Sequence, residues 1–267
     1  MKSYGYILFL TILTIFMNGC KKQPDCPEPM GYQQYGEPFS NVPATEDMVM
    51  YEVNLRAFSQ EGNLAGVQQK LDHLASLGVN VIWLMPIQTN GGPLNSPYCI
   101  FNFYEVDEEY GTLEDLRTFV AEAHSRNMAI ILDWVANHTS WDHPWIDSTG
   151  WHTTDAQGNI IHPSGTNWTD VADLNFDNTA LQEQMIDAMR YWVLEANVDG
   201  YRCDAADYVP FDFWQKAIDS LRSIPNRNVI MLAEGARTDH FDAGFDMNFD
   251  WNFYKIINNL VNLSISS

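Results

Sequence analysis

The chain has few basic residues, since 14 Lys and Arg stand against 35 Asp and Glu among 267 residues, a net charge of −21. A nucleic-acid partner is therefore not expected, because binding to phosphates depends on a basic surface. An acidic surface is instead compatible with a neutral ligand. Hydrophobic residues make up 46% of the chain, which excludes a largely disordered protein and allows a packed core.

Cysteine is also scarce, with four residues and no CxxC spacing among them. This pattern argues against both a zinc site and a disulfide framework. We expect Cys99 and Cys203, which stand in or beside apolar stretches, to be buried free thiols.

No long apolar run of membrane-spanning length is present, but the N-terminus holds a short one. Lys2 precedes the apolar run from Tyr6 to Met17, which is shorter than the ~20 residues that a span needs and ends near Cys20. Residues 1–19 resemble a bacterial lipoprotein signal, which implies a lipidated Cys20, attachment to a membrane, and a place in the periplasm or on the cell surface. An ordinary signal peptide or a signal anchor is the alternative. Residues 20–43 are rich in Pro, Gly and Gln and are typical of a tether.

From residue 44 onward, strand-like and helix-like segments alternate. Six stretches read as strands: MVMYEVNL (48–55), VNVIWLMP (79–86), MAIILDWV (128–135), VDGYRCDAA (198–206), NVIMLAEG (228–235) and GFDMNFDWNF (244–253). Helix-like segments between them, such as 64–78 and 112–127, predict right-handed βαβ units around a parallel sheet. Residues 139–178 lack this alternation and form a long irregular insertion.

Two folds fit this alternation, the doubly wound sheet and the (β/α)8 barrel. No glycine-rich phosphate loop follows the first strand, which argues against a nucleotide-binding doubly wound fold. Asp133, Asp204 and Glu234 each end a strand, and in a barrel that face carries the active site. We therefore expect a (β/α)8 TIM barrel over residues 44–267, truncated after about six strands.

Arg202 and Asp204 stand two residues apart, so their side chains share one face of the strand. The guanidinium should lower the pKa of Asp204 and keep it ionised, ready to act as a nucleophile. Glu234 ends the next strand, about 4.8 Å away, and an apolar setting would raise its pKa as a general acid requires. Two carboxyl groups ~5–5.5 Å apart are typical of retaining glycosidases. The alternatives are a structural ion pair for Arg202 and Asp204, and a hydrogen-bonded core residue for Glu234.

Asn137 and His138 follow the third strand and open the insertion. Both are good donors to sugar hydroxyls, and an Asn carbonyl can bind calcium. A polar loop without a ligand is the alternative.

Several of these motifs, in this order, resemble the signature regions of the α-amylase family, glycoside hydrolase family thirteen. The stretches are DWVANH (133–138), GYRCD (200–204), Glu234 after its apolar strand, VADLNFDN (171–178) and SPYCIFNFYEVDEEYGT (96–112). The resemblance covers residues 48–260. It implies a retaining enzyme that acts on α-glucosidic bonds of starch-like glucans or maltooligosaccharides, with an inserted domain B after strand three.

Carried over residue by residue, the resemblance makes Asp204 the nucleophile and Glu234 the general acid/base, with Arg202 orienting Asp204. Tyr98 and His138 would line the cleavage subsite. A further pair, Asn137 and Asp173, would hold a structural calcium ion.

The chain departs from the family pattern in three places. Asp207 and Tyr208 stand where many α-amylases have a Lys-His pair, and Asn102 stands where the family often has Asp. The His-Asp pair that follows strand seven in the family is absent. A carbohydrate-binding surface lipoprotein without catalysis, a transglycosylase of the same family and a barrel isomerase are the alternatives. The truncation also implies that the 267 residues alone are inactive.

Overall fold

The structure is a computed structural model that describes residues 31–92 and 96–265. The expected signal, residues 1–19, and Cys20 lie outside the described residues. Among the helices that are described, none is long and apolar enough to cross a membrane.

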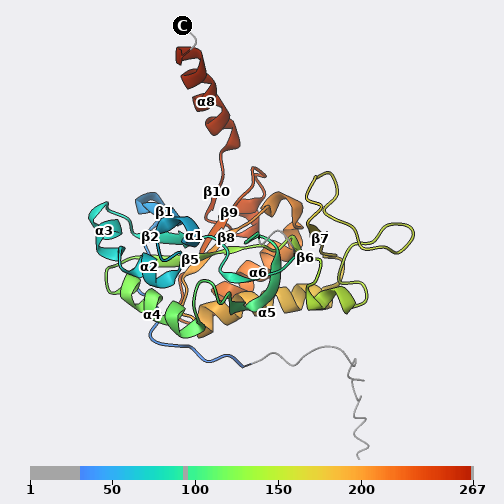
Figure 1. The fold of residues 1–267 in the computed structure, drawn as a ribbon, viewed down its shortest axis with the longest axis horizontal. Coiled ribbons are helices and arrows are strands. Elements are labelled where there is room, and N and C mark those ends of the chain that lie inside the picture. The colour runs from blue at the N-terminus through green and yellow to red at the C-terminus, as the bar shows by residue number, and fades with distance from the viewer. Residues whose placement is uncertain (1–30, 93–95, 266–267) are drawn as a thin grey trace, which may run out of the picture.

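Six parallel strands form one curled sheet at the centre of the molecule (Figure 1). In spatial order they are β1 (Met50–Val53), β2 (Val81–Leu84), β5 (Ala129–Trp134), β8 (Gly200–Cys203), β9 (Ile230–Ala233) and β10 (Met247–Asn248). Each strand pairs with its neighbour in parallel, and the spatial order follows the chain order. This is the strand arrangement of a (β/α)8 half-barrel and confirms the predicted fold class.

Helices follow the strands, as βαβ units require. The longer ones are α4 (Leu113–His124), α5 (Thr179–Glu195), α6 (Phe211–Arg222) and α8 (Trp251–Ile265), and the shorter ones are α1 (Leu55–Phe58), α2 (Leu64–Gln68), α3 (Leu71–Ser76) and α7 (His240–Ala243). The start of α4 is fixed by a capping box in which Thr112 and Asp115 each accept a backbone N–H of the other. The described residues also form three 3₁₀ helices: η1 (Thr45–Asp47), η2 (Pro144–Asp147) and η3 (Ala206–Tyr208).

The core has two layers because the strands are buried on both faces. In β2 and β5, Ile82 and Ile130 pack outward against the helices, while Val81 and Ile131 face the inside of the sheet. Burial on both faces explains why these strands read as continuous apolar runs in the sequence.

The insertion and the loops carry small strand pairs that the sequence pattern did not predict. β3 (Gln88–Asn90) pairs with β4 (Ile100–Val106), and β6 (His138–Ser140) pairs with β7 (Val171–Asp173), both antiparallel. The expected helix over 64–78 is wrong as a single element, because it breaks into α2 and α3 at Lys70, whose ψ of 4° is not helical.

Residues 31–43, the described part of the predicted tether, lie against the body of the protein. Tyr32 donates its hydroxyl to Asp187 at 2.6 Å, and the ring of Phe39 stacks on His124 with 4.4 Å between ring centroids. Phe39 is buried in the inner core layer with Val81 and Ile131. This stretch is therefore a docked arm rather than free chain.

Candidate active site

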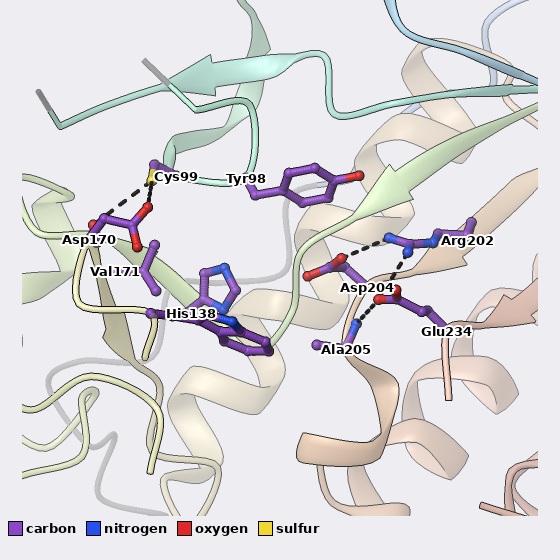
Figure 2. Close-up of a pocket in the computed structure, with 10 residues that line it drawn as sticks. Tyr98, Cys99, His138, Asp170, Val171, Arg202, Asp204, Ala205 and Glu234 are labelled. Atoms are coloured by element: carbon purple, nitrogen blue, oxygen red, sulfur yellow. Dashed lines mark hydrogen bonds and ion pairs between the residues drawn. The ribbon is translucent and has the colours of Figure 1, made fainter. Parts of the chain in front are cut away.

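The polar ends of the strands converge on one pocket, as the barrel topology predicts. The pocket has a volume of about 350 Å³, within the range of about 300–1,000 Å³ that small-molecule sites occupy. Figure 2 shows the side chains around it. The lining residues are Tyr98, Cys99, His138, Trp168, Asp170, Val171, Arg202, Asp204, Ala205 and Glu234.

Arg202 lies at the centre of the site and binds three carboxylates. Its Nη1 lies 2.8 Å from Asp204 Oδ1 and 2.9 Å from Asp133 Oδ1, and its Nη2 lies 2.9 Å from Glu234 Oε2. The guanidinium also stacks over the ring of Trp83, 4.8 Å from the centroid. Arg202 is 5% exposed, so these ion pairs are shielded from solvent and hold the carboxylates in fixed positions.

The structure brings Arg202 and Asp204 together as expected but corrects the expected charge behaviour of Asp204. Burial raises the pKa of Asp204, and this outweighs the opposing effects of the Arg202 charge and its hydrogen bond. The neighbouring cation favours the charged carboxylate, but desolvation disfavours it, and at this buried position desolvation has the larger effect.

Glu234 follows β9 directly, and Ala205 N donates to its Oε2 at 2.9 Å. Burial raises the pKa of Glu234, and the charge of Asp204 and a hydrogen bond between the two side chains add to the rise. Arg202 and the Ala205 N–H act against it. The upward direction agrees with the prediction for a general acid.

Asp133 supports the site from beneath, where it is fully buried. Its Oδ2 accepts from Trp83 Nε1 at 3.1 Å and from the hydroxyl of Tyr98 at 3.3 Å, while its Oδ1 accepts from Arg202. Tyr98 thus enters the pocket with its hydroxyl fixed (Figure 2). Its ring is available to stack on a ligand.

His138 and Trp168 line the pocket, and Tyr208 packs against Trp168. The rings of His138 and Trp168 lie 5.8 Å apart, and those of Trp168 and Tyr208 lie 5.3 Å apart. Burial lowers the pKa of His138 to about 4, so the imidazole is neutral at physiological pH and can donate to a sugar hydroxyl. Trp168 comes from the insertion, and Tyr208 follows β8 and is 51% exposed.

The two expected calcium ligands lie at the base of the insertion. Asn137 is buried and precedes β6, and its Nδ2 lies 3.3 Å from His138 Nδ1. Asp173 ends β7, and burial raises the pKa of its carboxyl group. Within residues 31–92 and 96–265, no three His, Cys, Asp or Glu side chains are grouped to hold a metal ion. Asn137 offers one side-chain oxygen and Asp173 offers two toward the six to eight that calcium takes, and the rest would come from backbone carbonyls and water.

Sequence reasoning did not find the contributions of Trp168 and Cys99. Trp168 sits in the irregular insertion, where no periodicity indicates which way a side chain points, so only the fold places it at the pocket. Cys99 and Cys203 are buried free thiols, as predicted, and Cys99 donates to Asp170 Oδ2 at 3.4 Å.

Comparison with known protein families identifies the family of this chain. The family model for the α-amylase catalytic domain matches residues 33–166 and 151–259. This chain belongs to the α-amylase family. Among curated relatives of this α-amylase-family chain, "Alpha-amylase 3" of Dictyoglomus thermophilum is 30% identical over 258 residues, which is 83% of this chain and 51% of that protein. "Trehalose synthase/amylase TreS" of Mycolicibacterium smegmatis is 35% identical over 199 residues, covering 60% of this chain and 33% of that protein.

Solved structures agree with the family assignment. An α-amylase from Lactobacillus plantarum superposes with a TM-score of 0.74 and 32% identity, over 82% of this chain and 55% of that one. The maltogenic α-amylase AmyB from Thermotoga neapolitana gives the same TM-score at 34% identity, over 82% of this chain and 52% of that one. The chain thus spans about half the length of these three α-amylases.

Proposed function

We propose that the protein is a retaining glycosidase that acts on α-glucosidic bonds of starch-like glucans or maltooligosaccharides. The observation that carries the proposal is the geometry of Asp204 and Glu234 on one buried guanidinium, at the mouth of a pocket with a tyrosine and a histidine in its wall. Relatives named as α-amylases, and one named as an α-glucosidase, support the substrate class.

In this mechanism the Asp204 carboxylate attacks the anomeric carbon while the glycosidic C–O bond breaks. Glu234 gives its proton to the leaving oxygen, and a covalent glucosyl ester on Asp204 results. Glu234 then takes a proton from water, the water oxygen attacks the anomeric carbon, and the ester bond to Asp204 breaks. The product keeps the configuration of the substrate because two displacements occur.

The proximity of the two carboxyl groups supports retention over inversion. Asp204 lies 2.8 Å from Arg202 Nη1 and Glu234 lies 2.9 Å from Arg202 Nη2, so one guanidinium holds the two carboxyl groups close together. An inverting pair stands ~6.5–9.5 Å apart to admit a water molecule between acid and base. Two carboxyl groups bound to the two Nη atoms of one guanidinium suit the shorter separation of ~5–5.5 Å that is typical of a retaining pair.

A transglycosylase of the same family is the second candidate, and the relatives named trehalose synthase favour it. In that case a sugar hydroxyl replaces water in the second step. The exposed ring of Tyr208 beside Trp168 offers a face on which an acceptor sugar could stack.

The proposal extends to cell location and metal. The resemblance of residues 1–19 to a lipoprotein signal supports anchoring through a lipidated Cys20, at the periplasmic or outer surface of a bacterial membrane. Asn137 and Asp173, at the junction of barrel and insertion, support a structural calcium ion there.

The test of the proposed reaction is Asp204→Asn in the protein that carries this chain. Because an amide is a poor nucleophile, hydrolysis of an activated α-glucoside should fall by roughly three orders of magnitude or more. The product anomer, followed by NMR in the wild type, reports retention. Asp219→Asn, on the exposed side of α6, is the matched control for loss of one carboxylate and should keep activity.

Two results would contradict this assignment. Near-normal turnover by a folded Asp204→Asn protein would remove Asp204 from the chemistry. Binding of maltooligosaccharides by the wild type without any turnover would favour the carbohydrate-binding lipoprotein instead.

A further inference from the structure

Asp207 stands where many members of this family have the lysine of a Lys-His pair, and it makes contacts that a lysine could not make. It lies in η3, three residues after Asp204, and its carboxylate points to the loop after β9. Oδ2 accepts from Ala236 N at 3.0 Å, and Oδ1 accepts from Arg237 N at 3.2 Å. A lysine has donors only, so it could not bind these two N–H groups.

Hydrogen bonds to backbone carbonyls also join the loop after β8 to the loop after β9. Arg237 Nη1 donates in return to the carbonyls of Asp207 and Val209, each at 3.2 Å. Nearer to the two carboxyl groups, Ala206 N donates to the backbone carbonyl of Glu234 at 2.9 Å. The loop that carries Asp204 and the loop that carries Glu234 are therefore joined at several points within a few residues of both carboxylates.

Gly235 shows how closely the two loops approach. A Cβ atom at this position would lie 2.4 Å from Asp207 Oδ1 and 2.5 Å from His240 Cε1. Ordinary Cβ contacts are longer than 3.0 Å, so only glycine fits here while Asp207 keeps its place. The absence of a side chain at Gly235 is therefore required for the Asp207 carboxylate to lie where it does.

We propose that Asp207 is a positioning residue that fastens the Glu234 loop to the Asp204 loop and sets the distance between the two carboxyl groups. It acts through hydrogen bonds to Ala236 and Arg237 and does not itself touch the reacting atoms. The inference rests on the proposed function only for its effect on catalysis. The fastening itself can be tested without any activity.

The first experiment is amide hydrogen exchange on the protein that carries this chain. In Asp207→Ala, the amides of residues 235–237 should exchange at least about tenfold faster, because two hydrogen bonds to a charged acceptor are lost. Asp207→Asn keeps one acceptor oxygen and should fall between the wild type and the alanine variant. Asp219→Ala, which removes an exposed carboxylate on α6, should leave this segment unchanged.

The second experiment separates positioning from simple structural support. If Asp207 places the general acid, Asp207→Ala should lose at least about tenfold more activity on a glucan, whose leaving group needs a proton, than on an activated aryl α-glucoside. Gly235→Ala forces the same junction open from the other side and should show the same split. The variant that carries both Asp207→Ala and Gly235→Ala should lose little more activity than either single variant, because both changes break the same contact between the two loops.

The outcomes are distinct. Wild-type exchange rates at residues 235–237 in Asp207→Ala would overturn the proposal. Faster exchange with equal losses on both substrates would also overturn it, because Asp207 would then support the fold without placing Glu234. A wild type that cleaves neither substrate would reject the proposed function, and the exchange result would still decide whether Asp207 fastens the loops.

Discussion

At the scale of single residues, the site is governed by three carboxylates that share one guanidinium. Asp133, Asp204 and Glu234 are 0%, 13% and 25% exposed at the side chain, and Arg202 supplies the only positive charge in ion-pair contact with them among the described residues. Burial raises the pKa of all three. One cation cannot neutralise three buried anions, so the cluster favours keeping a proton. Glu234, the most exposed of the three, is best placed to give that proton to a substrate.

This arrangement predicts how Glu234→Gln behaves. The amide cannot give up a proton, so cleavage of natural glucans should fall by roughly 10²–10⁴-fold. Activated aryl α-glucosides should lose much less in the bond-breaking step, because their leaving groups need little protonation. Steady-state and burst kinetics on the two substrates measure the difference. Equal losses on both would argue against an acid role.

The residues of the site could be predicted where the backbone pattern fixes direction. Arg202, Asp204 and Glu234 stand at strand ends, and the two-residue period of a strand places their side chains on one side. The pKa of Asp204 could not be predicted, because the sequence shows the neighbouring charge but not the burial. The position of Trp168 at the pocket could not be predicted either, because no helix or strand fixes the direction of its side chain.

At the scale of elements, the insertion is built around buried aromatic and histidine rings. His143 packs on Phe103 and Trp145, with centroids 5.6 and 4.6 Å away, and its Nδ1 accepts from Trp145 N at 3.0 Å to cap η2. Burial lowers the pKa of His143 to about 3. The ring must therefore stay neutral for the insertion to keep its fold.

A pH dependence of stability follows from His143. Its pKa is lower in the folded state than the ordinary value near 6.5, so between these values the unfolded chain binds the extra proton. Stability should fall as the pH drops below about 6.5, by about 2 kcal/mol at pH 5 from this residue. His143→Asn keeps a cap acceptor and cannot titrate, so it should lose less stability between pH 7 and 5.

Thermal melts at the two pH values measure this difference. His73→Asn, at an exposed position on α3, is the control and should behave like the wild type. The same drop for His143→Asn as for the wild type would show that other groups cause the acid sensitivity.

The proposed calcium ion belongs to the same element. An ion that binds only the native state stabilises it by mass action, about 2.7 kcal/mol at a hundredfold excess over Kd. A chelator should therefore lower the melting temperature of the wild type, and added calcium should restore it. The Asp173→Asn protein should have the same melting temperature with and without chelator. No shift, together with no calcium by elemental analysis, would reject the site.

Elements with strong periodicity were predictable and short ones were not. The capped α4 has its predicted start, because Thr112 and Asp115 are a local signal. The pair β3 and β4 has three and seven residues with irregular register, so its pattern is too short and broken to read. The break at Lys70 depends on packing that the apolar spacing of residues 64–78 does not reveal.

At the scale of the whole molecule, the curled sheet has two open edges. β1 pairs only with β2, and β10 pairs only with β9, among the strands that the structure describes. Beyond β10, α8 stands away from the body of the protein (Figure 1). Its large apolar side chains are exposed, with Phe253 at 61%, Ile256 at 57% and Leu260 at 58%. Contiguous apolar surface of this kind favours association.

These features predict that the 267-residue chain, prepared alone, self-associates and shows little or no glycosidase activity. Open strand edges and the apolar face of α8 can both pair with another copy, and a closed barrel of eight strands would remove those edges. Light scattering across a concentration series measures the association.

Two pairs of lysine substitutions on α8 test the role of its apolar face. Ile256→Lys with Leu260→Lys, one turn apart, should reduce the association. Asn252→Lys with Asn259→Lys adds the same charge without removing apolar surface and should reduce the association less. The net charge of −21 opposes association by repulsion, so added salt should strengthen it. A monomer at all concentrations with a cooperative melt and ordinary turnover would overturn this prediction, and would show that six strands with this pocket are enough for catalysis.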